Sequence, residues 1–259
     1  MRSQFNTKRK EIGNSLKCDK LSILTLEPFQ AQYEMHTEDN SGRKASWFVA
    51  QRIGFSEKNA PETIKEAVRK QKIGLLPQGG VAVPLCLQQL SNPAINGRAY
   101  CFLPLPEQTG LPMHINGHFV LDHEARRSLW KEEKGYKSEW NNLLISDIIS
   151  QAYIDALKFV KSQLFPDCKK KRQQTADMVM ANISSLEAVF PNSNEAVDRY
   201  WKYLVQSVFQ RIVTGGEPFF PVVLEQVNDK RKPNVECKWN AFHQAGHMFS
   251  VIFTENKDS

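Results

Sequence analysis

The segment from Arg98 to Trp130 constrains the fold most, because it is apolar and β-prone yet interrupted by prolines and glycines. Residues 99–106 (AYCFLPLP) predict a strand that ends at its prolines, since proline has no N–H for a strand ladder. Residues 108–112 then predict a turn. Asn116-Gly117, with apolar residues on both sides, predicts a β-hairpin because both residue types tolerate a positive φ.

The end of this segment predicts a helix that carries two arginines near its start. Asp122 is a residue type that caps helices, and Arg126, Arg127 and Trp130 follow it. Positive charge at a helix N-terminus opposes the helix dipole, and guanidinium groups match phosphate, so a phosphate contact is one explanation of the pair. The ordinary alternative is a solvated helix face with Asp122 and Glu124 as partners. Both interpretations stay open.

The remaining pattern places strands before helices. Strands are predicted over residues 21–35, 45–55, 81–87 and 218–223, the last of them buried, and a short helix over 61–72. Apolar residues at helical spacing predict helices over 140–165, 175–189 and 194–213. This order indicates an α+β fold with a strand-rich amino-terminal half and a helical carboxy-terminal half, rather than a doubly wound sheet.

Three regions are expected along the chain. Residues 1–19 are polar and basic and predict a tail, and residues 20–166 predict an α+β domain. A mainly helical subdomain is expected over residues 175–259, which stop without a clear closing element and suggest a truncated unit.

Composition indicates a globular chain and argues against a membrane-spanning one. With 41% apolar and 24% charged residues among 259, the chain can bury a globular core. The net charge of +6 comes largely from residues 8–10 and 169–172, runs that suit either nucleic acid or, more ordinarily, a solvated surface. Five cysteines without a C-x-x-C pair, and a polar amino terminus, predict a cytoplasmic chain with no membrane span.

The histidines offer two weak metal hypotheses. His243 and His247 have the spacing of a zinc-binding helix, but Gln244 replaces the glutamate that would act as general base. A metal-dependent hydrolase is therefore kept only as an alternative. His114, His118 and His123 follow each other near the predicted hairpin, where alternation is also the ordinary pattern of a half-exposed strand. We expect no metal and no cofactor.

One stretch of the chain resembles the large repeats of the sacsin family. The resemblance is densest from about residue 79 to 223, and its motifs are Tyr100–Pro106, Thr109–Leu121, the Arg126-Arg127-Ser-Leu-Trp130 run, Trp140–Leu144, Ala152-Tyr153 and Val222-Val223. It implies a middle-domain β-α-β fold of the ATPase family that includes the ninety-kilodalton heat-shock chaperone (Hsp90) and MutL. Gly110, Leu111, Pro112, Asn116 and Gly117 would then form a signature hairpin.

The resemblance also implies a chaperone role without catalysis by this chain. The family's nucleotide pocket needs an Asp-x-Gly-x-Gly turn and a glycine-rich lid, and neither motif occurs in residues 1–259. We therefore expect no ATPase and no other enzyme, but a fragment of a sacsin-like co-chaperone in protein folding and quality control. It would bind client proteins and chaperones of the seventy-kilodalton heat-shock (Hsp70) type. Arg126 or Arg127 would contact the phosphate of a nucleotide domain supplied elsewhere. The alternatives are the hydrolase above and nucleic-acid binding through the basic clusters.

Overall fold

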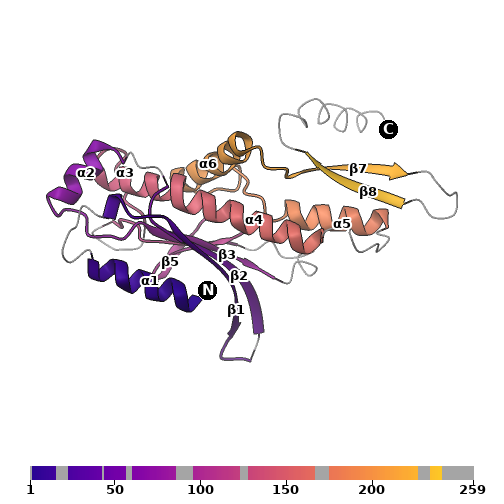
Figure 1. Ribbon diagram of the computed structural model, residues 1–259, viewed down its shortest axis with the longest axis horizontal. Coiled ribbons are helices and arrows are strands. Elements are labelled where there is room, and N and C mark those ends of the chain that lie inside the picture. The colour runs from indigo at the N-terminus through magenta and orange to yellow at the C-terminus, as the bar shows by residue number, and fades with distance from the viewer. Residues whose placement is uncertain are drawn as a thin grey trace.

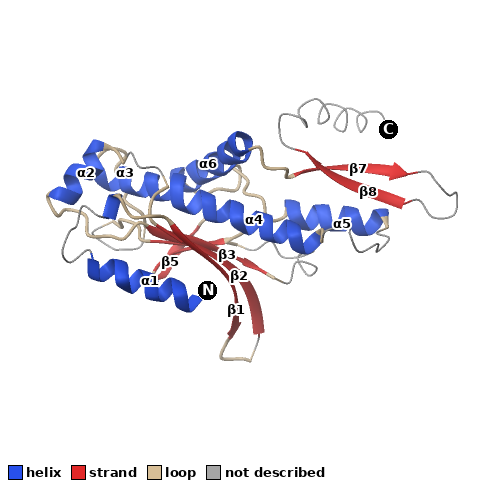
Figure 2. Ribbon diagram, viewed as in Figure 1, coloured by secondary structure: helices blue, strands red, loops and turns tan. Residues whose placement is uncertain are grey.

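A mixed six-stranded sheet with helices packed on it forms the centre of the protein, in agreement with the predicted α+β class (Figure 1). The structure is a computed structural model that describes residues 2–15, 23–42, 44–56, 60–85, 96–122, 128–166, 175–226 and 234–240. Figure 2 shows the long helices on one side of the sheet and the amino-terminal helix on the other. The sheet therefore has one covered face and one face that is only partly covered.

The strands of this sheet are mostly antiparallel. They are β1 (Phe29–Glu38), β2 (Lys44–Ile53), β3 (Gln78–Pro84), β4 (Arg98–Cys101), β5 (Leu103–Gln108) and β6 (His114–Gly117), in the spatial order β1-β2-β3-β6-β4-β5. Only β4 and β6 run parallel to each other. The order brings β6 between β3 and β4, so the middle of the sheet contains residues from three separate parts of the chain.

Alternation along β2 determines which side chains reach the helices. Phe48 and Ala50 belong to the large hydrophobic core, where the Phe48 ring stacks on Phe159 with ring centroids 3.7 Å apart. Trp47, Val49 and Gln51 lie on the opposite face because successive side chains of a strand point to opposite sides. This second set faces the open side of the sheet.

The Asn116-Gly117 hairpin prediction is wrong. Asn116 lies inside β6, opposite Gly80 of β3, and the chain does not reverse there. Gly117 serves packing instead, because a Cβ at this position would lie 2.7 Å from the Phe119 ring. The tight reversal occurs inside the predicted strand 99–106, at Phe102, whose φ is 64° and which joins β4 to β5.

The helices predicted over 61–72, 140–165, 175–189 and 194–213 are present with somewhat different bounds. They are α2 (Glu62–Arg69), α3 (Tyr136–Leu143), the π-helix η3 (Leu144–Ile149), α4 (Ser150–Leu164), α5 (Ala176–Glu187) and α6 (Arg199–Gly215). The side chains of Thr175 and Asp198 cap α5 and α6 by accepting backbone N–H groups of the first turn. α3, η3 and α4 follow each other without a break, so the single predicted helix contains a π-helical turn in its middle.

The helix predicted from Asp122 does not include Trp130. Leu129 forms an isolated antiparallel bridge with Leu121, and the Trp130 N–H donates to the Val120 carbonyl, as in a narrow loop. Residues 123–127, with Arg126 and Arg127, lie outside the described residues. Where the structure describes the chain again, Leu129 and Trp130 therefore pair with the segment before Asp122 and are not part of a helix.

The predicted polar tail contains a helix, α1 (Arg2–Ser15). Phe5 and Ile12 are buried in a small hydrophobic cluster with Ala31 and Ile53 of the sheet, although most of the other side chains of α1 are polar. Two apolar side chains seven residues apart are a weak signal for an amphipathic helix, which explains why composition alone indicated a tail.

The hydrophobic core continues from the sheet into the carboxy-terminal helices. One cluster includes Val81 of β3, Ile148 of η3, and Leu204 and Val208 of α6. Beyond α6, β7 (Phe220–Gln226) pairs with β8 (Asn234–Asn240) as a separate two-stranded sheet, beside α5 in Figure 1. No helix in the described ranges is long and apolar enough to cross a membrane.

Candidate binding groove on the open face of the sheet

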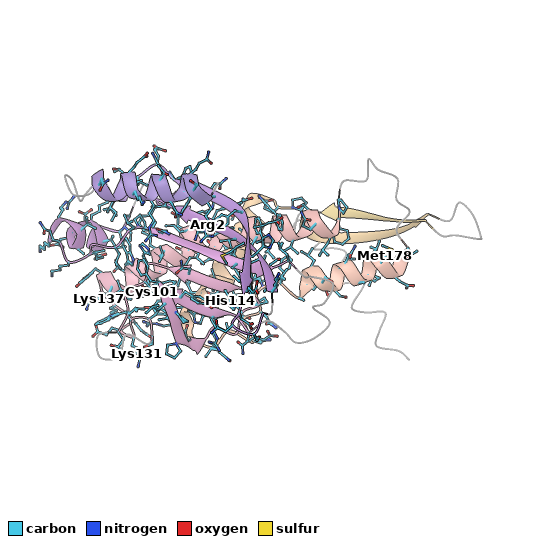
Figure 3. All side chains as sticks on the ribbon, turned by 90° about the horizontal axis from the view of Figure 1, so that it is seen from below. Arg2, Cys101, His114, Lys131, Lys137 and Met178 are labelled. Carbon is cyan, nitrogen blue, oxygen red and sulfur yellow. The ribbon has the colours of Figure 1, made fainter. Side chains whose placement is uncertain are left out.

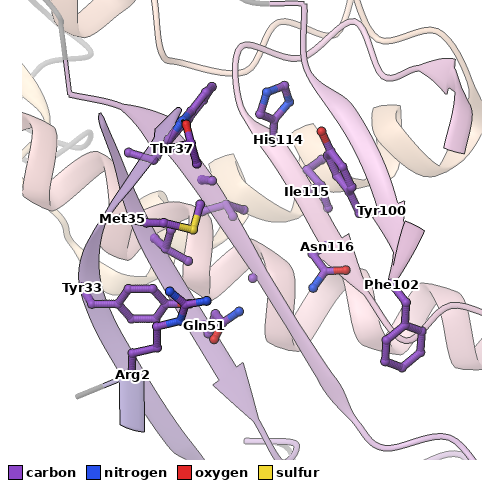
Figure 4. A pocket seen from close by; sticks show the side chains of 15 residues that line it. Arg2, Tyr33, Met35, Thr37, Gln51, Tyr100, Phe102, His114, Ile115 and Asn116 are labelled. Atoms are coloured by element: carbon purple, nitrogen blue, oxygen red, sulfur yellow. The ribbon is translucent and has the colours of Figure 1, made fainter. Parts of the chain in front are cut away.

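A groove of about 600 Å³ lies on the face of the sheet opposite the long helices. Side chains of β1, β2, β3, β4 and β6 line it, and Arg2 of α1 lies at its side (Figure 4). Figure 3 shows Arg2 and His114 over this face of the sheet. We call this site the groove.

The floor of the groove is hollow because Gly80 has no side chain. Gly80 lies between Gln51 of β2 and Asn116 of β6 in the sheet register. A Cβ at this position would lie 2.4 Å from the Ala50 carbonyl oxygen, so no larger residue fits this backbone. Ala82, the next residue of β3 on the same face, is also small. Together Gly80 and Ala82 leave the hollow, by which we mean the space above these two residues.

Aromatic rings form the end of the groove beside the hollow. The rings of Trp47 and Tyr100 lie on either side of His114, with centroid distances of 5.0 and 5.7 Å. The Trp47 indole N–H donates to Thr37 Oγ1 at 3.2 Å, which holds the indole against β1. These contacts fix a rigid wall of three rings.

His114 acts as a neutral hydrogen-bond donor in this wall. The backbone N–H of Arg98 donates to His114 Nδ1 at 3.0 Å, so the ring proton belongs on Nε2. Burial lowers the pKa of His114 below its usual value, and the nearby charge of Arg98 lowers it further. The imidazole is therefore uncharged near neutral pH.

Asn116 places a buried acceptor beside the hollow. Its Oδ1 atom is inaccessible to solvent and has no hydrogen-bond partner among the described protein atoms. Buried polar atoms of native proteins nearly always have a partner, so an acceptor without one next to a groove indicates a place for a donor. Of the other buried side-chain atoms described, only Gln78 Oε1 shares this property.

Two cationic side chains of α1 lie beside residues that line the groove. The Arg2 guanidinium lies 5.8 Å from the centre of the Tyr33 ring, and Arg9 lies at the same distance from the Phe102 ring. Burial raises the pKa of Tyr33, and the charge of Arg2 opposes that rise. Arg2 is the one charged side chain among the residues that line the groove.

Phe102 closes one end of the groove with an exposed aromatic ring. The side chain is 65% exposed although its backbone is left-handed, a conformation that is strained for a bulky residue. Its ring centroid lies 4.6 Å from that of His118. Burial and the charge of Arg9 lower the pKa of His118 to about 4, so His118 is neutral as well.

The lining residues suit binding rather than covalent chemistry. Among the described residues, the lining includes aromatic, amide and hydroxyl groups but no carboxylate and no thiol. Cys101 is a free cysteine whose pKa is raised by burial, so its thiolate is disfavoured. No group of three or more histidine, cysteine, aspartate or glutamate side chains in the described part of the chain could hold a metal ion.

The residues singled out from the sequence lie in different places. Arg126, Arg127, His123, His243 and His247 are outside the described residues. Asn116 and His114 line the groove.

The Gly110–Pro112 turn packs against the segment before α6. Leu111 is 1% exposed, and a Cβ on Gly110 would lie 1.7 Å from the Glu195 carbonyl oxygen.

Trp47, Tyr100 and Arg2 are groove residues that the sequence did not single out. Only their alternation on strands could have indicated a shared face, and strand order is not readable from one sequence.

Comparison with known proteins supports the resemblance to the sacsin family. Human sacsin is 42% identical to this chain over 140 residues, which are 53% of the chain and 3% of sacsin. About half of the chain is thus a sacsin-related region, and it spans a very small part of the length of that relative. No protein-family model matches the chain, and no solved structure matches it.

Proposed function

We propose that the chain is a chaperone-related, non-catalytic module that binds extended segments of client or partner proteins in the groove. The similarity to human sacsin supports the chaperone class. The observation that carries the proposal is the hollow over Gly80 and Ala82, which lies next to a buried amide acceptor and a wall of aromatic rings. An extended peptide has side chains, N–H groups and carbonyls that complement these three features.

The wider assignment follows the sacsin resemblance. We place the module in the cytoplasm, in protein folding and quality control, with Hsp70-type chaperones among its partners. A middle-domain fold of the Hsp90 and MutL family would allow Arg126 or Arg127 to contact a nucleotide held by another domain. Lack of ATPase motifs in residues 1–259 supports a role without hydrolysis by this chain.

The test is suppression of aggregation of a thermally unfolding model enzyme by the purified chain. Ala82→Leu fills the hollow from β3, and we expect it to reduce suppression by about tenfold in potency, because a Leu side chain occupies the space meant for the client. Ala181→Leu on the exposed surface of α5 is the matched control and should act like the wild type.

Thermal unfolding of both variants establishes that they are folded. The proposal fails if the wild-type chain does not suppress aggregation. It also fails if folded Ala82→Leu suppresses aggregation as well as the wild type does.

A further inference from the structure

The charged side chains in and around the groove that the structure describes are positive. Among the 15 lining residues, all from the part of the chain that the structure describes, Arg2 alone is charged. Arg9 lies over Phe102 at one end, and the charge of Arg98 acts on His114 at another part of the wall. A carboxylate bound in the groove would therefore lie near three cations and near no carboxylate of the described lining residues.

The hydrogen-bonding groups of the groove suit a peptide backbone. The Asn116 side-chain amide lines the groove, and its Oδ1 atom, which is shielded from solvent and has no partner among the described protein atoms, becomes available to an amide N–H when the side chain turns. His114 Nε2–H is a donor, which a carbonyl oxygen can accept. Asn116 and His114 are two residues apart on β6, so both lie on the same face of one strand, as Figure 4 shows.

The hollow between these groups accepts a side chain of limited size. Gly80 and Ala82 form its base, and Val49, which lies opposite Ala82 in the register, is an apolar residue beside it. Burying an apolar side chain there removes its surface from water, which favours binding. A peptide needs one apolar residue among its acidic residues to use the hollow.

We propose that the groove binds an extended acidic segment of a partner protein, with one apolar side chain in the hollow and its carboxylates toward Arg2 and Arg9. This inference rests on the proposed function and specifies the chemistry of the client. The basic net charge of the chain, +6, favours the approach of such a segment over a long range.

A single-stranded nucleic acid fits the same groove less well. The exposed Phe102 ring could stack on one base, but a single exposed ring does not make a stacking platform for a strand. Binding along a phosphate backbone also needs a continuous basic track, and one lining residue is charged. The groove is therefore assigned to a protein segment.

The experiment measures binding of three fluorescent peptides to the full chain by anisotropy. All three are short and extended and contain the same leucine residues, alternating with glutamate, lysine or glutamine. We expect the glutamate peptide to bind at least about tenfold more tightly than the lysine peptide, and to weaken as salt is raised from about 50 to about 300 mM.

Two variants locate the binding. Arg2→Glu should weaken the glutamate peptide by at least about fivefold and improve the lysine peptide, whereas the matched exposed change Lys202→Glu on α6 should alter neither by more than about twofold. Asn116→Leu should weaken all three peptides without lowering the unfolding midpoint, because it removes a buried acceptor that has no partner.

The outcomes separate this inference from the proposed function. Equal binding of the glutamate and lysine peptides overturns the acidic preference, while aggregation assays with Ala82→Leu still support groove binding. Displacement of the glutamate peptide by a single-stranded oligonucleotide, lost in the Arg2→Glu variant, assigns the groove to nucleic acid and overturns the inference. Failure of all peptides and of the model client removes both proposals.

Discussion

At the scale of single residues, the protonation of His118 is strongly coupled to folding. It is 5% exposed, its ring lies against Phe102, and Arg9 adds positive charge nearby. These surroundings lower its pKa from 6.5 to about 4. The folded protein therefore resists a proton that the unfolded chain accepts readily.

Stability should consequently fall on acidification. Because the folded pKa is the lower one, the contribution of His118 is fully present above pH 6.5 and is lost as the pH falls toward 4. The full loss amounts to about 3 kcal/mol, since one pKa unit corresponds to about 1.4 kcal/mol. Urea unfolding of the wild type and of His118→Gln at several pH values measures it. A difference between the two proteins that stays constant from pH 7.5 to pH 4.5 would contradict the assignment.

At the scale of elements, a half-buried ion pair connects the sheet to the long helix. Arg52 of β2 donates from Nε and Nη2 to Asp155 Oδ2 of α4, at 2.9 and 2.8 Å. A second pair, Arg211 of α6 with the fully buried Asp147 of η3, has a 3.0 Å contact. Asp147 also accepts the Ser56 backbone N–H at 2.6 Å. Each pair joins elements that are distant in sequence.

Removing one partner of the Arg52–Asp155 pair should cost more than removing both. Asp155→Ala leaves the guanidinium without its carboxylate, with the Gln30 side-chain oxygen as a neutral acceptor, and should lower the free energy of unfolding by about 3 kcal/mol. The double variant Arg52→Met with Asp155→Leu should recover at least about half of that loss, because no charge is then left without a partner. The exposed Asp177→Ala on α5 should change stability by about 0.5 kcal/mol or less. Chemical denaturation of all the variants decides, and a double variant no more stable than Asp155→Ala would contradict this prediction.

Elements whose structure follows from the local residue pattern were predictable, and those whose structure depends on pairing with distant segments of the chain were not. The helix over 140–165 follows from apolar spacing, and its strict 3.6-residue expectation explains why the π-helical turn at Leu144–Ile149 was missed. Asn116-Gly117 has the composition of a turn, yet pairing with β3 makes it a strand. Phe102 supplies the real reversal although aromatic residues disfavour a positive φ. Nothing in the local sequence could show either outcome.

The groove was even less predictable, because five strands supply its side chains. His114 was noticed in the sequence, but its neighbours Trp47 and Tyr100 are more than ten residues away along the chain. Only the strand order β2-β3-β6-β4 brings them together. The sequence singles out Asn116 as a turn residue, whereas in the structure it lies in a strand and lines the groove.

At the scale of the whole molecule, the loop before β6 joins the sheet to the helical half. Gly110 packs against the backbone of Glu195 just before α6, and the Val197 N–H donates to the Thr109 carbonyl at 3.1 Å. The core cluster is also shared, with Trp140 of α3 and Trp201 of α6 both buried in it. These contacts favour a single cooperative unit over the two-part division expected from the sequence.

Gly110→Ala tests that cooperativity. Its φ is +71° and the new Cβ would lie 1.7 Å from the Glu195 oxygen, so the loop must move away and the free energy of unfolding should fall by about 2–4 kcal/mol. Far-UV circular dichroism and tryptophan fluorescence should both report one transition, shifted equally, because sheet and helices unfold together. Gly74→Ala is the control, since a Cβ there meets nothing within 4 Å and stability should change by less than about 1 kcal/mol. Two separate transitions, of which only one moves in Gly110→Ala, would instead establish the helical half as an independent domain.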